Sequence, residues 1–283
     1  MTQKLSKFLP ENFDASARLS ILAGRGEYPK LLAQRLEDCG INASLTVFED
    51  ETAPDLVERF SDGRIDGVIN VGQLGKLLKS LKNGGVKYAI MAGQITPKKL
   101  FKGLKLDLKA MLVMAKLKRR NAETIFGAIA DELAKIGVEL LDARSFLDDS
   151  LAPEGFFCGK SWNITADNLE HAMTIAREMA RLDVGQSCIT SRGSVLAVEA
   201  WEGTDNMIER AGTFGARDCL FAKTVKPNQD YRFDVPVIGE RTVRKLAAAG
   251  VKNAVLEAGK VLILDKPKVL ELARQNDIKI FGI

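Results

Sequence analysis

The feature that most constrains the fold is an alternation of short apolar segments with helix-length segments over residues 18–92. Three of the apolar segments have the length and composition of buried strands: Arg18–Ala23, Ala43–Phe48 and residues 87–92. Residues 28–36 lie between the first two of these segments and have helical spacing, and we expect this helix to stop at Gly40. Strands that alternate with helices of this size predict a parallel sheet with Rossmann-like winding.

The chain of 283 residues is long enough for two domains. Between residues 148 and 162 the composition shifts to Asp, Ser, Pro and Gly, which is typical of a linker. We predict a lead-in at 1–17, a Rossmann-like N-terminal domain at 18–150, a linker at 151–163 and an α/β domain at 164–283. In the last of these, a helix at 166–182 precedes a hairpin of residues 187–190 and 195–200, and Glu257-Ala258-Gly259-Lys260 reads as the turn of a second hairpin.

His171 is the only histidine, which excludes histidine-rich zinc sites and the Ser-His-Asp triad. Any metal must then be held by carboxylates, which favours Mg²⁺ or Mn²⁺. The four cysteines form no CxxC pair and are expected to be reduced and mostly buried. No segment has the apolar length of a signal peptide or membrane span, so we expect a cytoplasmic protein. The net charge of +4 is too small to indicate a nucleic-acid partner.

Two loops at predicted strand ends contain glycine. Gly24-Arg25-Gly26 precedes a helix, where backbone N–H groups can approach a phosphate. Gly93-Gln94-Ile95-Thr96 follows a later strand and should face the same crevice, because ligands bind at the carboxyl ends of parallel strands. Glu49 and Asp50 lie where a ribose-binding acid would stand in a nicotinamide-dependent enzyme. Ordinary turns explain both loops equally well.

Residues 98–120 are strongly basic. The basic helical face would consist of Lys98, Lys102, Lys105, Lys109, Lys116 and Arg120, and the apolar face of Phe101, Leu104, Leu108, Met111, Leu112 and Ala115. Such a segment is either an ordinary surface helix or one that rests on anionic lipid headgroups.

The C-terminal half interleaves carboxylates with cations near predicted strand ends. The carboxylates are Asp183, Glu199, Asp205 and Asp234, and the cations are Lys223, Lys226 and Arg232. A phosphoanhydride hydrolase needs both, because cations neutralise phosphoryl charge while a carboxylate or metal positions water. The residues alone predict binding of a phosphorylated ligand and leave its hydrolysis open.

These stretches resemble the LpxI family, UDP-2,3-diacylglucosamine pyrophosphatases of lipid A synthesis. The resemblance extends from about residue 18 to 283, and its most specific stretches are residues 22–29, 181–186, 196–205, 223–229 and Asp234-Val235-Pro236. It implies a two-domain fold with substrate held between the domains. It also implies metal-assisted hydrolysis of UDP-2,3-diacylglucosamine to UMP and 2,3-diacylglucosamine 1-phosphate (lipid X).

The resemblance also implies roles for individual residues. Asp234 stands at the position of the family's essential aspartate, as metal ligand or water-orienting base, and we take Asp205 as a second metal ligand. Ligand contacts are implied at Glu27, Gly93, Gln94, Ile95, Thr96, Asp183, Gln186, Thr204 and Asp205. To these the residue pattern adds Gly24, Gly26, Glu199, Lys223, Lys226 and Arg232.

The resemblance and the basic segment together suggest peripheral contact with the inner-membrane surface, and we also consider a homodimer. Two other classes of protein stay open. A NAD(P)-dependent oxidoreductase would use the Gly24-Arg25-Gly26 turn and Glu49. A non-catalytic binder of nucleotide sugars or lipids would use the same polar residues without turnover.

Overall fold

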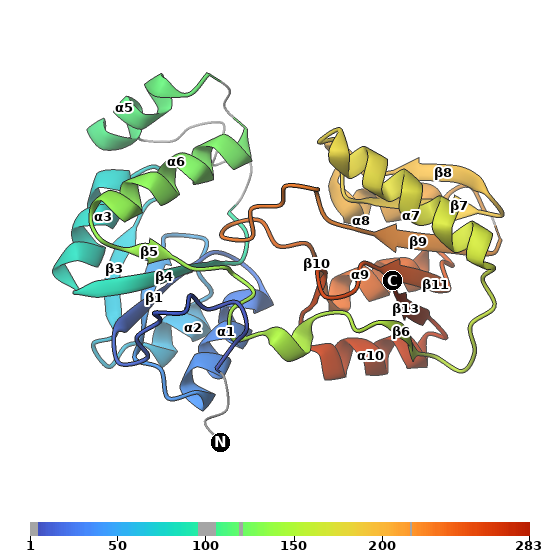
Figure 1. The fold of residues 1–283 in the computed structure, drawn as a ribbon, viewed down its shortest axis with the longest axis horizontal. Helices are drawn as coiled ribbons and strands as arrows, with labels where there is room; N and C mark the ends of the chain where they lie inside the picture. Colours follow the sequence, from blue (N-terminus) through green and yellow to red (C-terminus); the bar gives the residue numbers. More distant parts are fainter. Residues whose placement is uncertain (1–4, 96–105, 119–120, 216) are drawn as a thin grey trace. The chain divides into compact units, whose positions relative to one another are not determined.

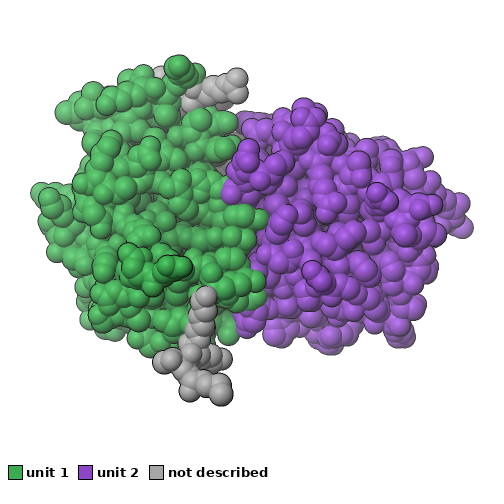
Figure 2. Space-filling view, in the orientation of Figure 1, with its two compact units in different colours: residues 1–148, 230–234 green, residues 149–229, 235–283 purple. Residues whose placement is uncertain are grey.

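The computed structural model describes residues 5–95, 106–118, 121–215 and 217–283. It forms two compact units (Figure 2): unit 1 is Met1–Asp148 with Asp230–Asp234, and unit 2 is Asp149–Gln229 with Val235–Ile283. The segment Asp230–Asp234 therefore belongs to the N-terminal unit, although the chain reaches it through the C-terminal half. The domain boundaries predicted from the sequence place these five residues in the C-terminal domain.

Unit 1 is built on a parallel sheet of five strands in the order β3-β2-β1-β4-β5. The strands are β1 (Arg18–Ala23), β2 (Ala43–Phe48), β3 (Ile65–Ile69), β4 (Val86–Ala92) and β5 (Glu139–Leu140). This is the order of the first five strands of a doubly wound dinucleotide-binding sheet. The parallel sheet predicted from the alternation of strands and helices is confirmed.

Helices cover both faces of this sheet (Figure 1). They are α1 (Glu27–Asp38), α2 (Pro54–Arg59), α3 (Leu74–Asn83), α5 (Leu108–Lys116) and α6 (Ala122–Lys135). Four buried leucines of α3 and Leu133 of α6 pack with Leu22 and Ala89 of the sheet. On the other face α1 buries Tyr28, Leu32 and its neighbours against the strands. Of the predicted basic segment, residues 106–118 are described, and they supply α5. The predicted residues Lys98, Phe101, Lys102, Leu104, Lys105 and Arg120 lie outside the described residues.

Unit 2 holds a mixed six-stranded sheet in the order β6-β13-β11-β9-β7-β8 and a separate parallel pair, β10-β12. The strands are β6 (Gly155–Cys158), β7 (Ser187–Ser191), β8 (Ser194–Val198), β9 (Cys219–Lys223), β10 (Val237–Ile238), β11 (Asn253–Leu256), β12 (Leu262–Ile263) and β13 (Lys279–Gly282). The helices are α7 (Ala166–Arg181), α8 (Gly203–Gly212), α9 (Glu240–Ala248) and α10 (Lys266–Gln275). The predicted mixed α/β character of this half is confirmed.

One hairpin prediction for unit 2 is confirmed and the other is wrong. β7 and β8 pair antiparallel, as predicted. β11 instead runs parallel between β9 and β13, and the segment after Glu257 leaves to pair β12 with β10. All four residues of β11 are buried, which is typical of a central parallel strand. The sequence pattern of two short apolar runs around a glycine does not distinguish these arrangements.

All four cysteines are free; Cys39 is exposed and the other three are buried. In the described part of the chain, no helix combines the length and apolar character needed to cross a membrane.

Candidate functional site

The two glycine-containing loops of unit 1 lie side by side beyond β1 and β4. Arg25 N donates to the carbonyl oxygen of Gln94 (2.7 Å), and Gln94 N donates to that of Arg25 (3.1 Å). Gly24 is buried beneath this bridge, and a Cβ at residue 24 would lie 2.5 Å from the Gln94 oxygen. Gly93 has φ 88° and faces the Arg25 carbonyl at similarly close range. Gly24 and Gly93 are therefore required by the contact between the loops, whatever they bind.

The start of α1 presents the next two predicted residues. Gly26 precedes the helix with φ 95°, has open space where a Cβ would stand, and no side chain caps the helix. Glu27 is exposed and pairs with Lys30 (3.4 Å), which also pairs with Asp55 (2.7 Å). An acid in a first helical turn is favourable to the helix dipole by itself. Ile95 is half-buried, while Thr96 lies outside the described residues.

Arg25 is held by the loop that follows β2. Its Nε lies 2.7 Å from Glu51 Oε2, and its Nη2 donates to the carbonyl oxygen of Asp50 (3.2 Å). The Glu51 side chain is fully buried, whereas Glu49 and Asp50 are exposed. The acid that organises this end of the sheet is thus Glu51. Sequence reasoning missed it, because nothing in the run Glu49-Asp50-Glu51 indicates which of the three acids is buried.

The segment Asp230–Asp234 is a compact turn on unit 1. Arg232 binds the Asp230 carboxylate through Nε (2.9 Å) and Nη2 (2.6 Å), and this pairing holds the pKa of Asp230 below its ordinary value. Asp234 N donates to the Asp230 carbonyl oxygen (3.1 Å), and Asp234 is half-buried. Phe233 stacks on Phe126 of α6, with 5.8 Å between ring centroids. Arg232 therefore bears an internal ion pair, where the sequence predicted a cation available to phosphate.

In unit 2, the carboxylate of Glu199 collects donors at one edge of the sheet. Ser187 Oγ donates at 2.6 Å, Thr204 Oγ1 at 2.8 Å and Gln186 N at 3.3 Å, while Lys223 Nζ lies 3.9 Å away. Burial alone raises the pKa of Glu199, but Lys223 and these hydrogen bonds outweigh it and leave the pKa below its ordinary value. The carboxylate is therefore ionised at neutral pH, and it holds Lys223, which also donates to Thr204 Oγ1 (3.2 Å).

The strand pairing explains why these residues meet. β7 is antiparallel to both neighbours, so the start of β7 lies beside the ends of β8 and β9, and Ser187 stands opposite Lys223. Glu199 directly follows β8, and its N–H donates to the Ser187 carbonyl oxygen (2.8 Å). Gly185 lies against the Glu199 backbone so closely that no Cβ fits. The ends of three strands thus gather residues that are far apart in sequence.

A second network continues along the same edge. Gln186 Nε2 donates to Gln229 Oε1 (2.9 Å), and the same oxygen accepts from Lys226 N (3.0 Å). Lys226 Nζ pairs with Asp183 Oδ1 at 2.5 Å, and Asp183 has φ 58° just beyond α7. The structure therefore brings together six predicted residues of unit 2: Asp183, Gln186, Glu199, Thr204, Lys223 and Lys226.

Glu257 is a buried acid of this edge that sequence reasoning missed. It follows β11, and its carboxylate accepts from Thr224 Oγ1, from Val225 N (3.3 Å) and from Lys260 Nζ (2.6 Å). Burial raises the pKa of Glu257, but the hydrogen bonds from Lys260 and Thr224 have the larger, opposite effect, so the pKa lies below its ordinary value. An acid directly after a buried strand is a feature that could have identified Glu257, but the sequence analysis assigned residues 257–260 to a hairpin turn.

Asp205 stands in the first turn of α8, where its carboxylate pairs with Arg241 of α9. Asp205 belongs to unit 2 and Asp234 to unit 1, so each unit holds one of the two predicted metal ligands. Over residues 5–95, 106–118, 121–215 and 217–283, no three His, Cys, Asp or Glu side chains gather as a metal site. Neither unit by itself provides a complete donor set.

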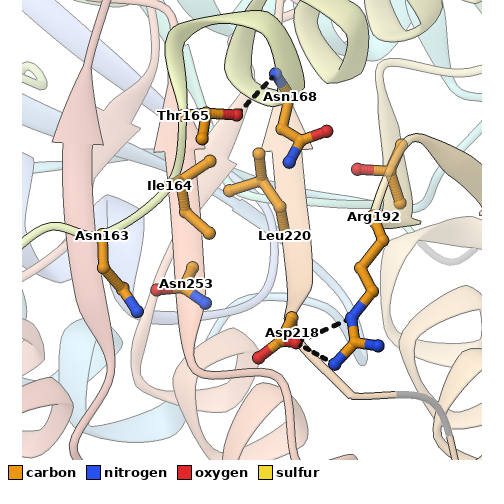
Figure 3. Close-up of a pocket in the computed structure, with 9 residues that line it drawn as sticks. Asn163, Ile164, Thr165, Asn168, Arg192, Asp218, Leu220 and Asn253 are labelled. Atoms are coloured by element: carbon orange, nitrogen blue, oxygen red, sulfur yellow. Dashed lines mark hydrogen bonds and ion pairs between the residues drawn. The ribbon is translucent and has the colours of Figure 1, made fainter.

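A pocket of about 270 Å³ lies at the other ends of the unit 2 strands (Figure 3). It is lined by Asn163, Ile164, Thr165, Asn168, Thr190, Arg192, Asp218, Leu220 and Asn253. Arg192 pairs with Asp218 through Nε (2.8 Å) and Nη2 (2.6 Å). None of the residues predicted from sequence lines this pocket, and its ion pair leaves no net charge to attract a phosphate.

Comparison with known proteins adds an independent line. Models of the LpxI N-terminal domain and LpxI C-terminal domain match residues 18–150 and 153–281. The UDP-2,3-diacylglucosamine pyrophosphatase LpxI of Caulobacter vibrioides is 30% identical over 280 residues, which cover 94% of this chain and 97% of that protein. The crystal structure of an isoflavone reductase aligns at a TM-score of 0.28 and 12% identity over 95% of this chain and 79% of that chain, a likeness too low to carry an argument.

Proposed function

The chain belongs to the LpxI family, and from this membership we propose that it hydrolyses the pyrophosphate bond of UDP-2,3-diacylglucosamine. In the proposed reaction the oxygen of water bonds to the phosphorus on the sugar side and the bridging P–O bond breaks. UMP leaves, and 2,3-diacylglucosamine 1-phosphate is the second product. The observation that carries the proposal is the match to both family domains, together with the name of the Caulobacter vibrioides relative, a UDP-2,3-diacylglucosamine pyrophosphatase.

Asp234 is the proposed catalytic carboxylate. In this role it orients the attacking water and accepts its proton, or it would hold a metal ion that lowers the pKa of that water. Its support is the turn of Asp230–Asp234, in which the Arg232–Asp230 ion pair and the Phe233–Phe126 stack limit the freedom of the backbone. A carboxylate on such a braced segment loses little entropy when it meets a reacting group.

The unit 2 edge is the proposed binding surface for the charged part of the substrate. Lys223 and Lys226 supply cations, and Glu199 and Asp183 hold their ammonium groups in place. An ammonium group has three N–H donors, so each lysine can keep its carboxylate partner while it also donates to an oxygen of an anionic pyrophosphate. Gln186 and Thr204 add hydrogen-bonding groups to the same edge.

We further propose Mg²⁺, replaceable by Mn²⁺, as the cofactor. Carboxylate oxygens such as those of Asp234 and Asp205 are the ligands these ions prefer, and the ion would neutralise charge on the pyrophosphate when bound.

The proposed substrate carries two acyl chains, so the enzyme must reach a lipid surface. The feature that supports such contact is α5, on which Leu108, Met111 and Leu112 are 70%, 49% and 54% exposed. Lys116 and Lys118, also exposed, follow them. Exposed apolar side chains beside lysines fit the headgroup region of an anionic membrane. Localisation on the cytoplasmic side and a homodimer stay predictions.

The test is release of UMP by the full chain from UDP-2,3-diacylglucosamine, with Mg²⁺ and with EDTA. Asp234→Asn should abolish turnover while substrate binding persists. The matched control is Asp62→Asn. Asp62 is an exposed residue of unit 1 that pairs with Arg64, and its variant should behave as wild type. Tight substrate binding by a folded wild type without UMP release would establish a binder instead. Thermal stabilisation by NAD(P)H would favour the oxidoreductase.

A further inference from the structure

The N-terminal lead-in precedes the residues matched by the family model, which begin at 18, yet it packs as part of unit 1. Ser6 is buried, and Lys7 N donates to Asp148 Oδ1 (2.9 Å). The Phe13 ring lies 4.7 Å from that of Tyr88 in β4. Since these contacts fix both ends of the described lead-in, the ring of Phe8 between them has a defined place.

The guanidinium of Arg144 contacts two aromatic rings. Its guanidinium carbon lies 4.1 Å from the centroid of Phe8 and 3.4 Å from that of Tyr231. Asp142 binds the same guanidinium at 2.6 Å, and only 13% of the Arg144 side chain is exposed. Cation–π contacts gain strength when they are desolvated, and the carboxylate fixes the plane of the guanidinium.

Tyr231 links these contacts of Arg144 to the segment that holds the proposed catalytic aspartate, Asp234. Ala143 N donates to the Tyr231 carbonyl oxygen (2.8 Å), so both the ring and the backbone of Tyr231 are held by the same loop. Asp234 follows three residues later in a turn closed by its own N–H on the Asp230 carbonyl. The Tyr28 hydroxyl donates to the Ala143 carbonyl oxygen, which ties the loop to α1 as well.

We infer that Phe8 of the lead-in is a positioning residue for Asp234, acting through Arg144 and Tyr231. The Phe8 ring contacts the same guanidinium as the Tyr231 ring, so it helps to keep Arg144 in place for Tyr231. Its catalytic consequence rests on the proposed function of Asp234, whereas its effect on the segment does not. A residue outside the region matched by the family model thereby contributes to the site.

The first experiment is backbone hydrogen exchange of the full chain, which requires no substrate. Phe8→Leu should speed exchange at Ala143 and Asp234 by about two- to fivefold, the size expected for loss of one cation–π contact. Phe8→Tyr keeps a ring and should exchange like wild type. Phe156→Leu, which removes a ring from unit 2, is the control and should leave both amides unchanged. Unchanged exchange in Phe8→Leu would overturn the inference.

The second experiment measures UMP release by the same variants. Phe8→Leu should lower kcat by about two- to fivefold with little change in KM, because the contact acts on the geometry of Asp234 and not on substrate binding. Phe8→Tyr should restore kcat. Equal loss in both variants, or an effect confined to KM, would refute a positioning role. If the wild type releases no UMP, the proposed function fails, and hydrogen exchange alone decides whether Phe8 orders the segment.

Discussion

Gly24 and Gln94 are in such close backbone contact that a single added Cβ at residue 24 would stand 2.5 Å from the Gln94 carbonyl oxygen. The contact joins the loop after β1 to the loop after β4. It accounts for a glycine that the sequence associates equally well with phosphate binding. A structural role of this kind predicts a loss of stability on substitution in the absence of any ligand.

Gly24→Ala should therefore lower the free energy of unfolding by about 1–3 kcal/mol, because the backbone of one loop must move to admit the methyl group. Gly127→Ala is the matched control: it lies inside α6 with nothing within 4 Å of its Cβ position. That variant should gain about 0.4–1 kcal/mol through the higher helix propensity of alanine. Urea unfolding of both variants decides the matter, and equal stability of Gly24→Ala and wild type would contradict it.

The sheet of unit 1 could be predicted because local sequence patterns are sufficient to identify its strands. Arg18–Ala23 and Ala43–Phe48 are mostly apolar and are buried on both faces, as central parallel strands are, and each precedes a turn and a helix. In unit 2 the same reasoning identified the β7–β8 hairpin from its Ser-Arg-Gly turn. Local periodicity and turn chemistry thus sufficed wherever neighbours in sequence are neighbours in space.

The rest depended on contacts between distant residues. Nothing near Glu257 indicates that β11 pairs with β9 and β13, so its carboxylate could not be placed beside Thr224. The placement of Asp230–Asp234 in unit 1 depends on contacts with Ala143 and Phe126, which lie roughly a hundred residues earlier in the sequence.

Glu199 should make the stability of the protein sensitive to acid. Its pKa is lowered in the folded state, since Lys223 and three donors outweigh the effect of burial. Such a group contributes stability above the pKa of an unfolded glutamate, about 4.3, and that contribution is lost as pH falls through the lower folded pKa. Glu199→Gln should cost about 2 kcal/mol at pH 7.

The difference between wild type and Glu199→Gln should narrow below about pH 4.3, where the glutamate of the unfolded chain takes up a proton while the folded carboxylate is still ionised. Urea midpoints measured from neutral to acid pH test this. Glu11→Gln, at an exposed position of the lead-in, provides the control and should run parallel to wild type. A gap between wild type and Glu199→Gln that stays constant through acid pH would show that the charge of Glu199 adds nothing to stability.

The exposed face of α5 should bind anionic lipid. Leu112→Glu places a charge among Leu108 and Met111, and it should weaken binding to phosphatidylglycerol-containing vesicles by about tenfold, the equivalent of one lost leucine insertion. Binding should also fall as salt screens the lysines. Val195→Glu, which alters an exposed apolar residue of β8 in unit 2, should bind as wild type. Equal binding of the two variants in vesicle flotation would exclude α5 as the contact.

Lys223 and Lys226 should separate stability from activity. Only 6% of the Lys223 side chain is exposed, and Lys223→Met leaves the buried Glu199 carboxylate without its cation, so unfolding should become easier by about 3–5 kcal/mol. Lys226 is 24% exposed and pairs with the more exposed Asp183, so Lys226→Met should change stability by at most about 1 kcal/mol.

Both lysine variants should nevertheless lose about tenfold or more in kcat/KM for UMP release, because each removes a cation that the proposed pyrophosphate site uses. Lys252→Met removes an exposed lysine whose ammonium donates to the Asn276 carbonyl, and it should retain wild-type kcat/KM. Lys226→Met is the decisive variant, since its fold should be intact. If it turns over substrate as fast as Lys252→Met, the polar edge of unit 2 is not where the phosphates bind.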